Sequence, residues 1–375
     1  MRSGKMSLCK RGLMSFLAAA CLLLPAQRAW AGIYIPSDPN PYPVTNSFSQ
    51  IRLNIGEYRS LLAFNPQDPK TITAEKGSLQ DQLLSRMAAL EAKLKEGSLK
   101  SVSDQLELTG CWLRTSQPGK VIAYLKTQQP DPADPDSVFL LSHLAMAQAA
   151  DPGLLPKAIA TMEDFLEQWP ETKASWKYPQ WRWTRRAETV LLQLWKTRHR
   201  ESLTSGKPML PVRIDTILGL EGLETTARFQ PGKLPRNVWD KLDAEAEPMV
   251  VQLLYWLPND ARLYWAYGEL LSAKGEIGAA YQVLNELVSA RQLSDVQTLF
   301  RHRAALSQAI AKLDEKSETK SAEGAASDNN APAASGEFPM KLYLNAIGLG
   351  ILIGAGMTIL LILQWRFIMT RFAGR

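Results

Sequence analysis

The chain has 375 residues, 46% of them hydrophobic, and a formal net charge of +6, which excludes a chain too polar to form a core. The positive charge is concentrated at the two ends, where residues 1–31 and 341–375 hold nine lysines and arginines and no acidic residue. Without those nine, residues 32–340 carry −3, so the composition gives no electrostatic basis for nucleic-acid binding.

Residues 1–31 have the features of a secretory signal. Positive residues precede an apolar stretch, Leu13–Leu24, that is too short for an ordinary membrane span. An A-x-A cleavage site ends at Ala31, so the mature chain is predicted to begin at Gly32. Two alternatives stay open, namely lipid attachment at Cys21 and an uncleaved N-terminal anchor.

Residues 32–47 are proline-rich and predict an extended arm, because proline lacks a backbone N–H and has a fixed φ. Cys111 is the one cysteine of the sequence outside the predicted signal, so no intramolecular disulfide is expected after cleavage. Its apolar neighbours favour a buried core residue over a reactive thiol.

Helical periodicity dominates residues 48–204 and residues 237–315. Ser47 is typical of a helix N-cap, and so is Ser78, which precedes a long amphipathic stretch that ends at Gly97. The sequence therefore predicts an all-α fold with two helical repeat regions.

Residues 261–292 resemble a tetratricopeptide repeat, with aromatic, small and aliphatic residues at the spacing of that pattern. The glycine and the alanine of the pattern are expected to let the two helices cross closely. The positions assigned to repeat packing are Tyr264, Gly268, Leu271, Gly275, Ala280 and Leu284. Weaker matches at 106–129, 153–170 and 246–258 indicate degenerate repeats stacked as an α-solenoid. The alternative is a helical bundle without repeats.

Two segments break the helical pattern. Residues 205–236 contain four prolines and several glycines, and the alternation at 212–215 allows a short β-hairpin insertion. Residues 316–339 contain one aromatic and no large aliphatic residue, so they are predicted to form a disordered tether.

Residues 342–363 are predicted to form a transmembrane helix. They carry no charge, and at about 1.5 Å per residue they reach roughly 33 Å. The arginines of the following tail, 364–375, favour a cytoplasmic tail and an N-terminal domain on the other side of the inner membrane. Gly350 and Gly354 form a G-x-x-x-G motif, a candidate contact with a second copy or another membrane protein, although glycine is common in membrane helices.

The sequence contains no G-x-S-x-G, H-E-x-x-H, Walker-loop or C-x-x-C motif, and its three histidines have no metal-ligand neighbour three or four residues away. No catalytic residue, metal ligand or cofactor is therefore predicted, and the chain is not expected to be an enzyme.

One local cluster, between residues 176 and 186, combines three tryptophans and a tyrosine with arginines. Such side chains dominate protein interfaces and also stack on sugars or cations. The candidate partner-binding residues are Trp176, Tyr178, Trp181, Arg182, Trp183 and Arg185. The alternative is that most of these rings belong to the core stripe of a long helix that begins near Tyr178.

The signal, the Tyr-x-Pro-rich start of the mature chain, the stretch 256–280 (WLPNDARLYWAYGELLSAKGEIGAA) and the anchor together resemble exported, membrane-anchored tetratricopeptide-like proteins of planctomycete-type bacteria. That family has no assigned activity, so the resemblance implies a fold and a location without a site. We expect a membrane-tethered, periplasm-facing scaffold that binds envelope proteins and no nucleic acid. The alternatives are a cell-wall or carbohydrate-binding module that uses the aromatic cluster, and an ancillary subunit of an inner-membrane complex.

Overall fold

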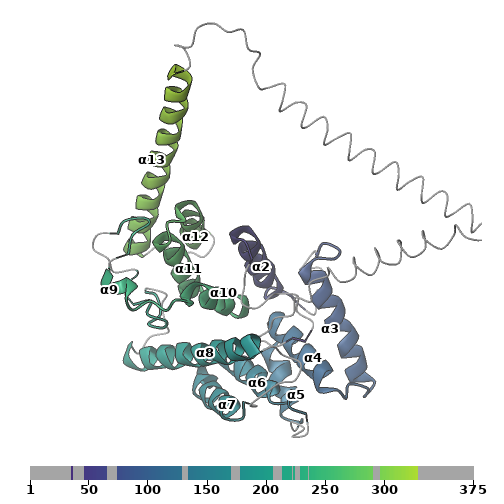
Figure 1. Cartoon of the computed structure of the whole chain (residues 1–375). Coiled ribbons are helices and arrows are strands. Elements are labelled where there is room, and N and C mark those ends of the chain that lie inside the picture. Colours follow the sequence, from purple (N-terminus) through teal and green to yellow (C-terminus); the bar gives the residue numbers. More distant parts are fainter. Residues whose placement is uncertain are drawn as a thin grey trace, which may run out of the picture. The chain divides into compact units, whose positions relative to one another are not determined.

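The computed structural model describes residues 35–36, 46–65, 74–128, 134–169, 178–205, 213–221, 223, 229–234, 236–289 and 296–327. Within these ranges the fold is all-α, with twelve α-helices, a 3-10 helix and no strand, which confirms the predicted fold class (Figure 1). The chain divides into two compact units, Met1–Lys312 and Leu313–Arg375. The described part of the second unit is the end of the last helix.

The first helical region packs its helices against one another in chain order, from α2 with α3 to α7 with α8. Its elements are α2 (Phe48–Leu61), α3 (Leu79–Lys95), α4 (Val102–Arg114), α5 (Pro118–Leu125), α6 (Phe139–Ala149), η2 (Pro152–Leu154), α7 (Leu155–Glu167) and α8 (Tyr178–Ser205). The last of these begins at Tyr178, where the sequence predicts a helix start, because proline at the second position is tolerated in a first helical turn.

The second helical region follows after an irregular connection. Its elements are α9 (Arg236–Trp239), α10 (Ala246–Trp256), α11 (Ala261–Ala273), α12 (Ile277–Ser289) and α13 (Gln297–Ser327). Helix α10 packs against α8 and α2 of the first region as well as against α11. It therefore joins the two regions into one core.

The predicted helix caps are present. The Ser47 hydroxyl accepts a hydrogen bond from the Gln50 N–H at 3.3 Å, and the Ser78 hydroxyl accepts one from the Asp81 N–H at 3.2 Å. Gly97 follows α3 with a φ of +70°, which glycine adopts without strain. These caps satisfy backbone groups that a helix end would otherwise leave without partners.

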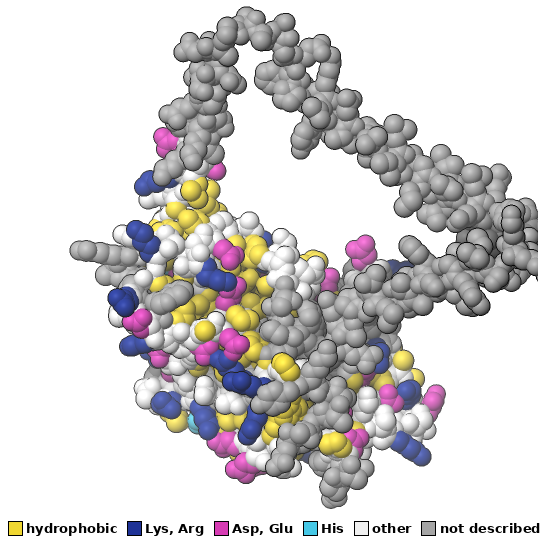
Figure 2. Space-filling model, in the orientation of Figure 1, with side chains coloured by type: hydrophobic (Ala, Val, Ile, Leu, Met, Phe, Trp, Pro, Cys, Tyr) yellow, Lys and Arg dark blue, Asp and Glu magenta, His cyan; other side chains and the backbone are white. Residues whose placement is uncertain are grey.

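The core is built from aliphatic and aromatic side chains of both regions, among them Tyr58, Phe139, Phe165, Tyr255 and Trp265. Cys111 is fully buried within it, as its apolar neighbours predict. On the surface, the face seen in Figure 2 carries acidic and basic side chains interspersed with apolar ones. This mixture agrees with the small net charge of the central sequence.

Helix α2 lies against three helices of the second region. Arg52 donates to Gln282 Oε1 of α12 at 2.7 Å, and Asn54 donates to the Tyr255 hydroxyl of α10 at 3.2 Å. The rings of Phe48 and Tyr267 of α11 are 6.4 Å apart between centroids. Helix α2 therefore covers a face that α10, α11 and α12 form together.

The expected β-hairpin insertion is absent from the described parts of the connection, 213–221 and 229–234, which are irregular apart from one antiparallel bridge between Gln230 and Lys233. Leu218 and Gly219 both have positive φ, so the chain turns and does not extend. A Cβ at Gly219 would lie 1.9 Å from the Lys241 carbonyl oxygen, so this turn requires glycine.

The first half of the predicted tether, residues 316–327, is helical, because α13 continues to Ser327. The sequence there is poor in large apolar residues but rich in alanine, glutamate and lysine, which are strong helix formers. A composition that cannot form a core can still form a helix. The remainder of the predicted tether lies outside the described part of the chain.

Candidate functional site

A pocket of about 440 Å³ lies where the two helical regions meet. Its wall combines the end of α2, the turn between α4 and α5, the end of α6, the start of α7, the middle of α8 and the turn between α10 and α11. Most of the wall is apolar. The side chains that shape it include Leu62, Leu113, Met146, Leu155, Trp195 and Trp256.

The turn between α4 and α5 forms one part of the pocket wall. At the end of α4, Ser116 adopts a φ of +56°, which turns the chain sharply into α5. Its backbone N–H donates to the Leu113 carbonyl at 3.2 Å, and the Gln117 N–H donates to the Trp112 carbonyl at 2.8 Å. This tight turn places Leu113, Ser116 and Pro118 side by side in the wall.

Arg198 and Asp260 form the charged part of the wall. Arg198 Nη2 donates to Asp260 Oδ1 at 3.0 Å, and a second, shorter bond joins Nη1 to Oδ2. Asp260 is also the N-cap of α11, because its Oδ1 accepts a hydrogen bond from the Leu263 N–H at 3.0 Å. The Asp260 carboxylate thus caps the start of α11 and also holds the guanidinium group of Arg198 in α8.

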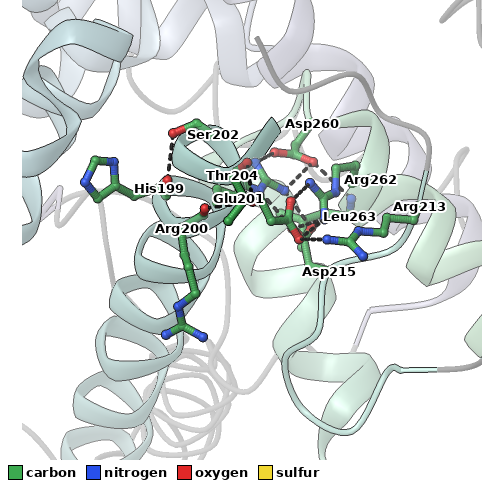
Figure 3. A network of polar contacts seen from close by, with 11 residues as sticks. His199, Arg200, Glu201, Ser202, Thr204, Arg213, Asp215, Asp260, Arg262 and Leu263 are labelled. Atoms are coloured by element: carbon green, nitrogen blue, oxygen red, sulfur yellow. Dashed lines mark hydrogen bonds and ion pairs between the residues drawn. The ribbon is translucent and has the colours of Figure 1, made fainter. Parts of the chain in front are cut away.

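The pair belongs to a larger ion network, shown in Figure 3, in which Glu201, Asp215, Asp260 and Arg262 point toward one another. Asp215 accepts from Arg198 Nε at 3.0 Å and Nη2 at 2.7 Å, and its Oδ1 lies 3.0 Å from Arg262 Nη2. Arg262 Nη1 in turn donates to Glu201 Oε2 at 2.6 Å.

Among the described residues, the network contains equal numbers of positive and negative groups. Its members are Arg198, Arg213 and Arg262 with Glu201, Asp215 and Asp260. The formal charges of these six residues cancel. Their ion pairs join α8, the 213–221 connection and the start of α11. We therefore interpret this group as a structural link. Its members Arg198 and Asp260 also form the charged part of the pocket wall, which we call the floor of the pocket.

The pKa shifts agree with permanent ionisation. Burial raises the pKa of Asp260, but the charge of Arg198 and its hydrogen bonds outweigh burial and hold that pKa below its ordinary value. Glu201 behaves in the same way, since Arg262 and Arg213 overcome the effect of burial and lower its pKa. Burial would lower the pKa of Arg198, whereas Asp260 and Asp215 raise it above its ordinary value. These groups stay charged near neutral pH and are poorly suited to proton transfer.

Two further buried polar clusters lie elsewhere in the core. His302 Nδ1 lies 2.7 Å from Glu269 Oε1, which also accepts a hydrogen bond from Trp265 Nε1 at 2.8 Å. His143 Nδ1 lies 2.7 Å from the Thr109 hydroxyl. All five side chains are buried, so these contacts are available to join helices and not to meet a ligand from solvent.

The described residues of the aromatic cluster differ in burial. Trp181 and Trp183 are buried, with 8% and 5% of their surface exposed, and the Trp181 ring packs 4.6 Å from that of Trp169. Arg182 and Arg185 are exposed. Neither ring is among the described residues that line the pocket. Tyr178 is the first residue of α8, and Trp176 lies outside the described residues.

The residues assigned to repeat packing come together between α11 and α12. A Cβ at Gly268 would lie 2.6 Å from Leu284 Cδ2 and 3.0 Å from Val283 Cγ1, so glycine allows this close approach. Tyr264, Leu271 and Ala280 are buried, and Gly275 turns the chain between the helices with a φ of +86°.

The candidate membrane contact, Gly350 and Gly354, lies beyond the described part of the chain, as does the whole segment 342–363. Within the part that the structure describes, no helix is both long and apolar enough to cross a bilayer. The same residues contain no group of three or more histidine, cysteine, aspartate or glutamate side chains placed to hold a metal ion.

Sequence reasoning missed both the pocket and the ion network. Arg198 lies 17 residues from Asp215 and 62 residues from Asp260, and no local pattern indicates that the three side chains meet. The one local signal was Asp260 as an N-cap, since aspartate precedes the amphipathic stretch of α11.

Comparison with models of protein families, with curated proteins and with solved structures finds no match.

Proposed function

We propose that the chain is a membrane-tethered, periplasm-facing helical scaffold that binds protein partners at the cell envelope. The support for the location comes from the sequence, in which residues 1–31 have the pattern of a secretory signal and residues 342–363 that of a membrane anchor followed by arginines. The protein would then sit in the inner membrane with its helical part outside the cytoplasm.

The observation that carries the proposal is the pocket between the two helical regions. It combines an apolar wall, a charge-balanced floor and a volume of about 440 Å³, within the range of roughly 300–1,000 Å³ typical of binding sites. Its charged groups are engaged with one another and stay ionised, which favours holding a partner over transforming one.

The helical hairpins support a scaffold built from degenerate repeats. Helices α6 and α7 pack together, as do α11 and α12, and each pair is joined by a short turn. A stack of such hairpins would form an α-solenoid, whose usual role is to bind proteins. Helix α2 covers the face formed by α10, α11 and α12, so that face is not open to a partner. The pocket is therefore a more accessible docking place than that face.

The alternatives gain less support. A cell-wall or carbohydrate module would need exposed rings, whereas Trp181 and Trp183 are buried. An ancillary subunit of a membrane complex would depend on Gly350 and Gly354, which lie outside the described residues, so this alternative rests on the sequence alone.

Affinity purification of the full chain from its native membranes in mild detergent tests the proposal. We expect at least one envelope protein to co-purify in a fixed ratio, and we expect no retention on purified cell wall. Retention on cell wall without a protein partner would favour the carbohydrate alternative and contradict the proposal.

A further inference from the structure

We propose that the pocket between α4, α6, α8 and the α10–α11 turn is an anchor site for an uncharged segment of a protein partner, which inserts one or two large apolar side chains. This inference rests on the proposed function and names the chemistry of the partner. It follows from three properties of the pocket, namely its wall, its floor and its rim.

The wall selects apolar groups. Trp195 and Trp256 face the pocket together with Leu113 and Met146, and each of these four side chains is at least nine-tenths buried. Rigid side chains held by the core form a preformed surface, so an apolar group that enters gains contact area without ordering the wall. Interfaces between proteins draw most of their binding energy from such buried anchors.

The floor selects against charge. Arg198 and Asp260 are the charged groups among the described lining residues, and each is paired with the other and with the network behind them. A charged side chain that entered would lose its hydration without gaining an opposite charge. An uncharged segment avoids this cost.

The rim offers polar groups to a polypeptide backbone. Ser116 and Asn259 line the pocket and are exposed, and Asn259 Oδ1 is held by Arg59 Nε at 3.3 Å. This bond orients the amide so that its Nδ2 group remains as a donor, and the Ser116 hydroxyl is both donor and acceptor. An apolar centre with a polar rim is the usual composition of a protein interface.

Binding of defined peptides to the full chain in lipid nanodiscs tests the inference, with empty nanodiscs as the blank. The probes are N-acetylated, C-amidated octapeptides of serine and glycine that differ only in their two central residues, which are Trp-Leu, Leu-Leu, Ser-Ser, Glu-Glu or Lys-Lys. We expect the two apolar peptides to bind at least about tenfold more tightly than the other three. Equal binding of all five, or tightest binding of a charged peptide, would overturn the inference.

Two variants of one wall residue locate the binding. Ala150 lines the pocket and is exposed, so Ala150→Trp fills the space and Ala150→Glu adds a charge without overpacking the core. Both should abolish the preference for apolar peptides. The matched control is Ala160→Trp, at an exposed alanine of α7 outside the lining, which should leave the preference unchanged. Equal effects at both positions would overturn the assignment to this pocket.

Co-purification of the full-length variants separates this inference from the proposed function. If a partner is retained undiminished by Ala150→Trp, the anchor inference fails while the scaffold function stands. If the peptides show the expected preference but no protein co-purifies with the unaltered chain, the scaffold function fails while the pocket chemistry stands.

Discussion

Arg198 in the middle of α8 and Asp260 at the start of α11 are 62 residues apart in the chain and meet through two hydrogen bonds, one of them 3.0 Å from Nη2 to Oδ1. Their side chains are 13% and 12% exposed. This one pair joins the two helical regions, caps α11 and forms the charged part of the pocket wall. The position of the proposed docking site therefore depends on it.

Removing the charge of Asp260 should destabilise the fold. Asn is also a good N-cap, so Asp260→Asn keeps the cap of α11 and removes one of the two counter-charges of Arg198, the other being Asp215. Loss of one partner that leaves a buried charge unpaired costs about 3–5 kcal/mol, and because Asp215 still pairs with Arg198 we expect a loss at or below the lower end of that range, which urea unfolding would measure. The matched control is Asp104→Asn, which breaks the exposed pair with Lys93 at 3.0 Å and should cost about 1 kcal/mol or less. Equal losses in both variants would contradict a structural role of the network.

The same network predicts acid sensitivity. Asp260 and Glu201 have folded-state pKa values below their ordinary values of 3.8 and 4.5. A lowered pKa contributes stability that is fully present above the unfolded-state pKa and is lost as the pH falls through the folded-state pKa. We expect the urea midpoint to fall below about pH 4.5, and to fall less steeply in Asp260→Asn than in the unaltered chain. Parallel profiles would show that Asp260 does not contribute.

The sequence contains enough information for the local structure and too little for the pocket. Caps such as Ser47, Ser78 and Gly97 act on backbone groups within a few residues, so their types and positions indicate the helix ends. The pocket needs six segments of the chain to converge, and the network needs partners 12 to 62 residues apart. Such convergence depends on tertiary packing, which cannot be predicted from the hydrophobic periodicity of the sequence.

The aromatic cluster shows the same limit. Trp181 and Trp183 are two residues apart, so they project from nearly opposite sides of α8. A helix with one buried face would expose one of them, so the sequence alone leaves both the binding interpretation and the core interpretation open. Helix α8 packs against α7 and also against α10, so both rings find a buried environment.

Truncation of Trp183 should therefore act on stability. It is 5% exposed, and removing a buried tryptophan costs about 3–5 kcal/mol, partly through the cavity that remains. Thermal unfolding of Trp183→Ala checks this. Leu203→Ala on the same helix, at a side chain that is 71% exposed, is the control and should change stability by about 0.5 kcal/mol or less. An unchanged melting temperature in Trp183→Ala would reopen the interpretation of this ring as a binding anchor.

Gly268 should be sensitive to the smallest added side chain. Its Cβ would lie 2.6 Å from Leu284 Cδ2, so Gly268→Ala should overpack the contact between α11 and α12 at a cost of about 1–3 kcal/mol. Gly56 lies inside α2 with no neighbouring atom within 4 Å of a Cβ, so Gly56→Ala should stabilise by up to about 1 kcal/mol. Differential scanning calorimetry of both variants compares the signs, and a gain in both would mean that the hairpin tolerates a wider separation.

Photo-crosslinking in native cells tests the central claim most directly. A photoreactive amino acid replaces Ala150 at the pocket wall in one full-length chain and Ala160 on the exposed face of α7 in another. The scaffold proposal predicts a discrete protein adduct from position 150 and a much weaker or absent one from position 160. No protein adduct from position 150, or the same adducts from both positions, would contradict it.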